Sequence, residues 1–152
     1  RQAAEGLAYV HTKYVIQGDV SVGNLLLDRQ SSVKLYDFQG KLLHSDGTVA
    51  LDGGSSERSM SSMPRSDRNY RNYRTNIFAF GTALCVIISG QLPFPDLDTL
   101  DEDEIHRKFE NHNFPPLEEL PAEDVIRKCW IGEYGNATEI VGDLQMLEER
   151  TR

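Results

Sequence analysis

The stretch YVIQGDVSVGNLLLDRQSSVKLYDFQ, residues 14–39, decides the fold. Two short apolar runs, Leu25–Leu27 and Val33–Leu35, flank residues 28–32, which have the composition of a turn. Short β-prone runs separated by polar turn residues predict a β-hairpin. Since a hairpin brings its two ends together, residues just before the first strand and just after the second should lie close to each other.

Three polar residues stand at the edges of this predicted hairpin: Asp19, Asn24 and Asp37. An amide oxygen from Asn24 and a carboxylate from Asp37 suit a hard cation such as Mg²⁺, which takes water and phosphate oxygens as further ligands. A second carboxylate, Asp19, would orient or deprotonate a hydroxyl that attacks such a phosphate. The alternative is structural, because Asp and Asn at loop ends are often only turn residues.

Outside the hairpin the pattern is mainly helical. Residues 1–11 have apolar side chains at helical spacing. Residues 77–89 form an apolar run that ends at Gly90 and predicts a buried core helix, too short to span a membrane as a helix. Further helices are expected at residues 103–111, 122–129 and 137–149.

A polar stretch, residues 45–74, is rich in Gly, Ser, Asp and Arg and predicts a long, mobile loop. Within it an arginine recurs every three residues, at Arg65, Arg68, Arg71 and Arg74. The repeat predicts a solvated loop surface, with a basic patch for phosphate or an acidic partner as the alternative. Six carboxylates in residues 96–104 lack the spacing of a calcium loop and favour the acidic first turn of a helix.

Composition limits the function classes. The chain has 152 residues and a net charge of −8, with 39% hydrophobic and 26% charged residues, which is typical of one globular domain and argues against nucleic-acid binding. Residues 1–74 carry 10 basic and 8 acidic side chains, whereas residues 75–152 carry 6 and 16, so anion-handling chemistry is expected in the first half. Cys85 and Cys129 predict buried, reduced thiols. We expect an intracellular, cytoplasmic protein, with the nucleus as an alternative, and no membrane association.

The order D-x-x-x-x-N, two short strands and then D-F resembles the catalytic loop and metal-binding segment of protein kinases. Here these motifs are residues 19–24 and 37–39. Residues 6–11 resemble the helix before the kinase catalytic loop, and residues 76–81 the start of the central helix of the C-terminal lobe. Residues 89–94 resemble the turn after that helix, and Cys129 with Trp130 resembles a later helix of the lobe. The whole pattern is most similar to divergent kinase-like proteins of fungi.

This resemblance implies a partial protein kinase domain over residues 1–152, with the mainly helical C-terminal lobe, the small β-hairpin and no N-terminal lobe. It implies ATP and Mg²⁺ as cofactors and a protein substrate or partner. Asp19 would be the catalytic base, and Asn24 and Asp37 would hold Mg²⁺ on the ATP phosphates. Leu26 would lie beneath the adenine ring, and Phe38 would pack in an internal hydrophobic column. The activation segment would fall within residues 37–74, chiefly 45–74.

Several residues depart from the family pattern. Gln17 and Gly18 replace the usual His-Arg, so a docking point for a phosphorylated activation loop is missing and the hydrophobic column is weakened. Ser21 replaces a Lys that contacts the transferred phosphate, Gln39 replaces a Gly, and Asn76 replaces an anchoring Asp. No Ala-Pro-Glu closes the activation segment.

Two functions are therefore open. No Gly-rich loop or strand Lys precedes the catalytic loop, and the opening residues lack an initiator Met, so the chain is expected to be part of a longer one or a truncated gene product. The first hypothesis is ATP-dependent phosphoryl transfer to a protein hydroxyl. The second is a catalytically impaired pseudokinase lobe that acts as a protein-interaction module.

Overall fold

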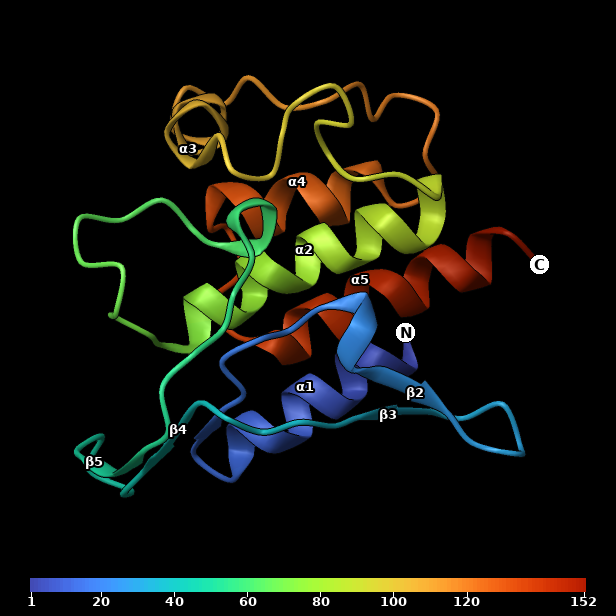
Figure 1. Cartoon of the computed structure of the whole chain (residues 1–152). Coiled ribbons are helices and arrows are strands. Elements are labelled where there is room, and N and C mark those ends of the chain that lie inside the picture. Colours follow the sequence, from blue (N-terminus) through green and yellow to red (C-terminus); the bar gives the residue numbers. More distant parts are fainter.

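The computed structural model describes all of residues 1–152 and contains five α-helices, two 3₁₀ turns and two small antiparallel sheets (Figure 1). In chain order the elements are α1 (Gln2–Thr12), β1 (Val15–Ile16), η1 (Val22–Asn24), β2 (Leu25–Leu27), β3 (Val33–Leu35), β4 (Lys41–Leu43), β5 (Val49–Asp52), η2 (Ser59–Ser61), α2 (Tyr73–Ser89), α3 (Glu102–Glu110), α4 (Glu123–Ile131) and α5 (Ala137–Arg150).

Helix α2 runs through the middle of the molecule, between α4 on one side and α1 and α5 on the other (Figure 1). The predicted core helix is confirmed, and it ends as expected at Gly90, which has left-handed backbone angles. It begins earlier than predicted, because Asn72 and Thr75 form a reciprocal capping box that starts the helix at Tyr73.

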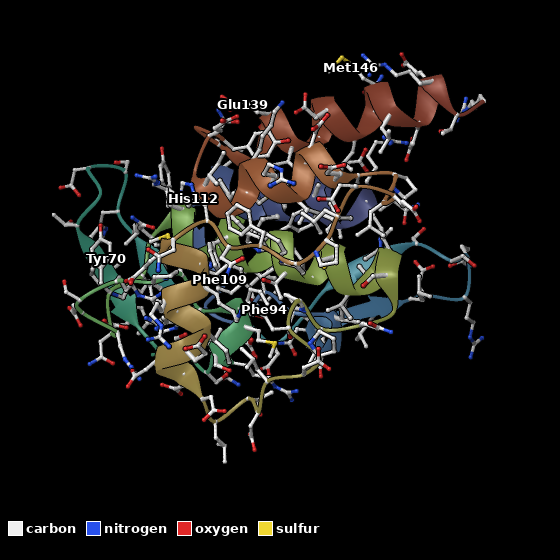
Figure 2. The ribbon with its side chains drawn as sticks, turned by 90° about the horizontal axis from the view of Figure 1, so that it is seen from above. Tyr70, Phe94, Phe109, His112, Glu139 and Met146 are labelled. Carbon is white, nitrogen blue, oxygen red and sulfur yellow. The ribbon has the colours of Figure 1, made fainter.

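The core is densest where aromatic rings from separate elements meet around Phe109 of α3. Its ring centroid lies 4.9 Å from that of Phe78, 5.1 Å from Phe94 and 5.2 Å from Trp130, all with edge-to-face geometry. Such pairs contribute beyond the burial of their area. Figure 2 shows Phe94 and Phe109 side by side in this cluster. The cluster thus packs α2, α3 and α4 against one another.

The β-hairpin is confirmed, with Leu25 opposite Leu35 and Leu27 opposite Val33. Outside the hairpin, where mainly helix was expected, β1, β4 and β5 form a second sheet in the order β1-β4-β5 that was not predicted. Residues 45–74, predicted as one long loop, contain β5 and η2. The fold is therefore a mixed α/β one, although its core is helical.

The three later helices lie within one or two residues of their predicted positions. The acidic cluster begins α3 as expected, with Glu102, Asp103 and Glu104 in the first turn. Cys85 and Cys129 are buried free thiols, as predicted. None of the helices has the length and apolar character needed to cross a membrane.

Candidate active site

The structure brings Asp19 and Asn24 into direct contact. Residues 22–24 form the 3₁₀ turn η1, which returns the chain so that Asn24 Nδ2 lies 3.0 Å from Asp19 Oδ2 and 2.8 Å from the Asp19 carbonyl oxygen. The amide donates both hydrogen bonds. Asn24 is buried and its backbone oxygen accepts from Tyr36 N, which fixes it at the base of the hairpin.

Gln17 connects the segment that carries Asp37 to the same site, although the sequence analysis described this residue only as a departure from the family pattern. The fully buried Gln17 side chain donates from Nε2 to the carbonyl oxygens of Tyr36 and Asp37, each at 3.1 Å. Its Oε1 accepts from Asp19 N at 2.6 Å. One amide therefore fastens the loop that carries Asp19 to the segment that carries Asp37.

The backbone of Gln17 is anchored in turn by the central helix. Gln17 N donates to Asn76 Oδ1 at 2.9 Å, and His11 Nε2 lies 3.3 Å from the same oxygen. Asn76 of α2 thus contacts the catalytic loop at the position where the kinase resemblance implies an anchoring Asp. The one signal of its burial in the sequence is that Gln17 directly follows the apolar pair Val15 and Ile16.

Three glycines allow the site segments to cross at short range. A Cβ atom on Gly18 would lie 2.7 Å from Gly40 Cα, one on Gly40 would lie 1.8 Å from Ile16 O, and one on Gly53 would lie 2.4 Å from Gln39 O. Gly18 also has φ of +89°, a conformation that side chains with Cβ rarely adopt. An arginine at position 18 therefore does not fit this backbone, and the close packing of the segments requires the glycine.

Asp37 itself lies at the surface. Its φ of +59° is in the left-handed region, and its Oδ1 accepts from Gln39 Nε2 at 2.8 Å. Phe38, expected in an internal hydrophobic column, is 49% exposed and lines an open groove with Tyr9 and Val10. The expectation of an internal hydrophobic column at Phe38 is therefore wrong, because its ring lies at the surface.

Burial raises the pKa of Asp19 above its ordinary value, and the negative charge of Asp37 acts in the same direction. Hydrogen bonds from Asn24 and Ser56 and the charge of Arg58 oppose this shift without cancelling it. Asp19 Oδ1 is buried and has no hydrogen-bond partner. A buried carboxylate oxygen without a partner is well suited to accept a proton or a hydrogen bond from a ligand.

The donor set fits Mg²⁺ with incomplete protein ligation. The amide nitrogen Nδ2 of Asn24 donates to Asp19, so the amide oxygen Oδ1 remains available as a metal ligand. Asp37 offers a carboxylate at the surface. The structure contains no group of three or more His, Cys, Asp or Glu side chains that could hold a metal ion. Leu26, predicted to lie beneath an adenine ring, is 49% exposed.

Comparison with known proteins identifies the class to which this fold and site belong. Residues 1–138 match the family model described as protein tyrosine and serine/threonine kinase. The match covers most of the chain, which therefore belongs to the protein kinase family.

Similar proteins come from a plant and from Dictyostelium discoideum. The serine/threonine-protein kinase STY17 of Arabidopsis thaliana is 23% identical over 98% of this chain and 26% of its own length. A PTI1-like tyrosine-protein kinase of the same plant is 32% identical over 63% of this chain and 28% of its own length. The dual specificity protein kinase pyk3 of Dictyostelium discoideum is 26% identical over 95% of this chain and 11% of its own length. The chain thus spans between 11% and 28% of the length of these relatives, and the likeness to fungal proteins stays a prediction.

Proposed function

We propose that this chain carries the part of a protein kinase site that contains the catalytic loop and Asp37, and that it supports ATP-dependent phosphoryl transfer to a protein hydroxyl. The observation that carries the proposal is the direct contact between Asp19 and Asn24, with Asp37 fastened to the same loop by Gln17. If Asp19 and Asp37 were unrelated turn residues, no buried side-chain amide such as that of Gln17 would be needed to connect their segments. Membership of the kinase family supports the same chemistry.

Asp19 is proposed as the general base. Above its pKa the carboxylate accepts the proton of the attacking hydroxyl, and a raised pKa makes it a stronger proton acceptor at neutral pH. The hydroxyl oxygen then bonds to the γ-phosphorus of ATP while the bond to the bridging oxygen breaks and ADP leaves. Asn24 keeps the Asp19 side chain in a fixed orientation through its two hydrogen bonds.

Asn24 and Asp37 are proposed to hold Mg²⁺, and Leu26 to lie under the adenine ring. The bound cation would neutralise phosphate charge as it moves to the leaving group. The left-handed backbone at Asp37 and the hydrogen bond from Gln39 fix where this carboxylate lies. Gln39 therefore helps to position the Asp37 carboxylate, although it stands where the family has a glycine.

A pseudokinase lobe that binds a partner protein is the second candidate, favoured by one observation. Ser21 stands in place of a phosphate-contacting Lys, and position 18 has no room for the arginine that would dock a phosphorylated activation loop. Loss of the Lys reduces stabilisation of the transferring phosphoryl group.

Titration of the chain with MgATP, followed by its unfolding temperature, separates the two candidates. A ligand that binds only the folded state raises the unfolding temperature by an amount that grows with the logarithm of its concentration relative to Kd. We expect a rise with MgATP that is absent in Asp37→Ala. Asp96→Ala, which removes an exposed carboxylate elsewhere, should retain the full rise. No rise in the unchanged protein would contradict the nucleotide site and favour the partner-binding module.

A further inference from the structure

The catalytic loop carries no positive charge of its own. Residues 14–28 contain neither Lys nor Arg, and Ser21 stands where the kinase resemblance implies a phosphate-contacting Lys. Phosphoryl transfer moves negative charge onto the leaving oxygen, and a cation placed beside the transferring group lowers the barrier. A cation that replaces this Lys would have to come from another segment of the chain.

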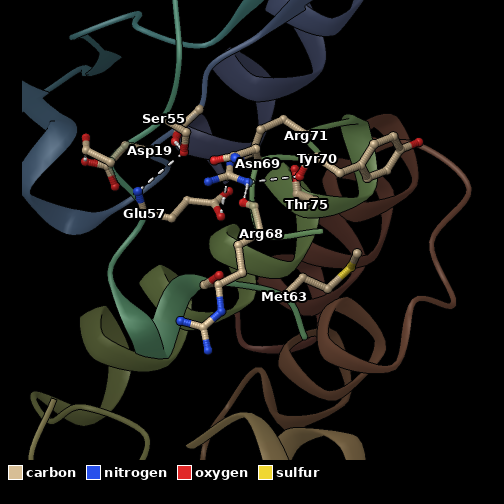
Figure 3. Close-up of polar contacts among 12 residues, drawn as sticks. Asp19, Ser55, Glu57, Met63, Arg68, Asn69, Tyr70, Arg71 and Thr75 are labelled. Atoms are coloured by element: carbon tan, nitrogen blue, oxygen red, sulfur yellow. Dashed lines mark hydrogen bonds and ion pairs between the residues drawn. The ribbon is translucent and has the colours of Figure 1, made fainter. Parts of the chain in front are cut away.

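The segment after β5 brings an arginine to the loop. Ser55 Oγ donates to the carbonyl oxygen of Gly18, and Ser56 Oγ lies 3.4 Å from Asp19 Oδ2 (Figure 3). Arg58 follows two residues after Ser56, and its φ of −77° and ψ of 156° are those of extended backbone. Since side chains two residues apart in an extended chain point to the same side, about 7 Å from each other, Arg58 points to the side of Asp19.

The exposure of the segment agrees with this direction. Ser56 and Arg58 are exposed, whereas the side chain of Glu57 between them is only 1% exposed. Such alternation is typical of an extended chain with one side toward the protein interior. The positive charge of Arg58 also lowers the pKa of Asp19, which indicates that the guanidinium group lies within Coulombic range of the carboxylate.

The backbone that follows Arg58 is fixed to the core through η2. Ser59 Oγ donates to the carbonyl oxygen of Thr99 at 2.7 Å, and Thr82 Oγ1 donates to that of Met60, also at 2.7 Å. Ser59 and Met60 are both buried. The Cα atom of Arg58 is therefore held in place on both sides, while its exposed side chain can turn toward a ligand.

The neighbouring arginines are already paired. Glu57 Oε2 lies 2.8 Å from Arg65 Nη2 and 3.5 Å from Arg71 Nε, and the two arginine side chains are only 8% and 9% exposed. Arg68 pairs with the acidic first turn of α3. The prediction of a solvated arginine loop is thus wrong for Arg65 and Arg71, because both reach inward to one buried carboxylate.

Arg58 takes part in none of the ion pairs of the structure. An exposed guanidinium group without an anionic partner is available to a phosphate, to which it can donate two parallel hydrogen bonds. The place of Arg58 beside the catalytic loop and its free guanidinium group together distinguish it from the other arginines of this region.

We propose that Arg58 is a further catalytic residue, which contacts the γ-phosphate of ATP and stabilises the transferring phosphoryl group in place of the Lys that Ser21 replaces. The inference rests on the proposed function of the site. Arg58 stays protonated throughout, so the proton of the attacking hydroxyl still goes to Asp19 and ADP still leaves.

The test is modification of arginines in the full chain with phenylglyoxal, quantified at each residue by mass spectrometry. Since only the unbound fraction reacts, MgATP at about ten times its Kd should slow modification of Arg58 by about tenfold. MgADP at the same ratio lacks the γ-phosphate and should leave the rate within about twofold of that without nucleotide. Arg29, exposed at the tip of the hairpin and also without an ion pair, is the internal control and should react equally in all three conditions.

Affinity provides the second measurement. Arg58→Met keeps much of the apolar length of the side chain and removes its charge, so we expect MgATP to bind about tenfold more weakly and MgADP to bind unchanged. Arg29→Met is the matched control and should alter neither affinity. The double variant Arg58→Met with Ser21→Lys returns a cation to the catalytic loop and should recover most of the lost MgATP affinity.

Equal protection of Arg58 by both nucleotides, or no protection by bound MgATP, would overturn the proposal. An unchanged MgATP affinity in Arg58→Met, or no recovery with Ser21→Lys, would overturn it as well. If neither nucleotide binds the unchanged protein, the proposed function fails and the role of Arg58 fails with it. A protein that binds MgATP but leaves Arg58 reactive contradicts the role of Arg58 alone, so the two failures are distinguishable.

Discussion

Gln17 shows how one side chain can replace several interactions at a site. A glutamine amide has both donors and an acceptor, and here it donates to two carbonyl oxygens and accepts from one backbone amide while fully buried. An imidazole at this position has only two ring nitrogens, so it could not reproduce all three contacts. The departure from the family pattern at residue 17 therefore preserves the link between the two halves of the site by different chemistry.

Replacement of Gln17 by Met should therefore be costly. Methionine has nearly the same length but leaves two carbonyl oxygens and one amide hydrogen, all partly buried, without their glutamine partners, so we expect a loss of about 2 kcal/mol in the free energy of unfolding. Urea denaturation measures this value. Gln39→Met removes one exposed hydrogen bond, to Asp37, and should change the free energy of unfolding by less than about 0.5 kcal/mol. Similar losses in both variants would show that the three buried contacts are not the cause.

At the scale of elements, the parts that were predictable are those whose cause is local. The β2–β3 hairpin follows from two apolar runs around a turn, and the end of α2 from Gly90. The β1-β4-β5 sheet depends on strands of two to four residues paired across the chain, which carry little local signal.

The same distinction holds at the site. The spacing of Asp19 and Asn24 was readable because they share one loop. The contacts of Gln17 join residues 19 and 20 positions apart, and Glu57 meets an arginine eight residues along the chain. Neither has a fixed sequence spacing that would have predicted it.

Two helical glycines provide a test of how closely α2 and α4 pack. A Cβ on Gly81 of α2 would lie 2.6 Å from Cys129 Cβ of α4, whereas a Cβ on Gly142 of α5 would meet nothing within 4 Å. Gly81→Ala should therefore cost about 2 kcal/mol through overpacking, while Gly142→Ala should add about 1 kcal/mol by restricting the unfolded chain. Thermal unfolding of both variants gives the comparison. A stabilised Gly81→Ala variant would contradict the close approach.

At the scale of the whole molecule, a buried polar path connects the first helix to the site through the central helix. His11 of α1 and Gln17 of the catalytic loop share the Asn76 oxygen of α2, and the His11 ring packs at 4.6 Å from that of Tyr73. Surface ion pairs such as those of Arg1 and Arg68 contribute little by comparison. The pH dependence of folding should therefore reflect groups on this path more than the net charge of −8.

His11 provides the corresponding prediction. Burial lowers the pKa of His11 to about 4, against an ordinary value near 6.5, so the unfolded chain binds the proton more readily than the folded one. Its contribution to stability is complete above pH 6.5 and is lost as the pH falls to about 4, which amounts to about 3 kcal/mol. Burial raises the pKa of Asp19 and Glu57, and these groups act in the opposite direction. The informative quantity is therefore the difference in the free energy of unfolding between a His11 variant and the unchanged protein.

We expect His11→Gln to lose the part of the pH dependence that lies between pH 6.5 and 4, so that its free energy of unfolding converges with that of the unchanged protein as the pH falls. His44→Gln alters an exposed histidine in the turn between β4 and β5 and should leave the profile unchanged. Urea denaturation across this pH range measures all three proteins. If the His11→Gln and unchanged profiles run parallel, His11 is not held neutral by burial, and the path from α1 through Asn76 to the site does not depend on its protonation state.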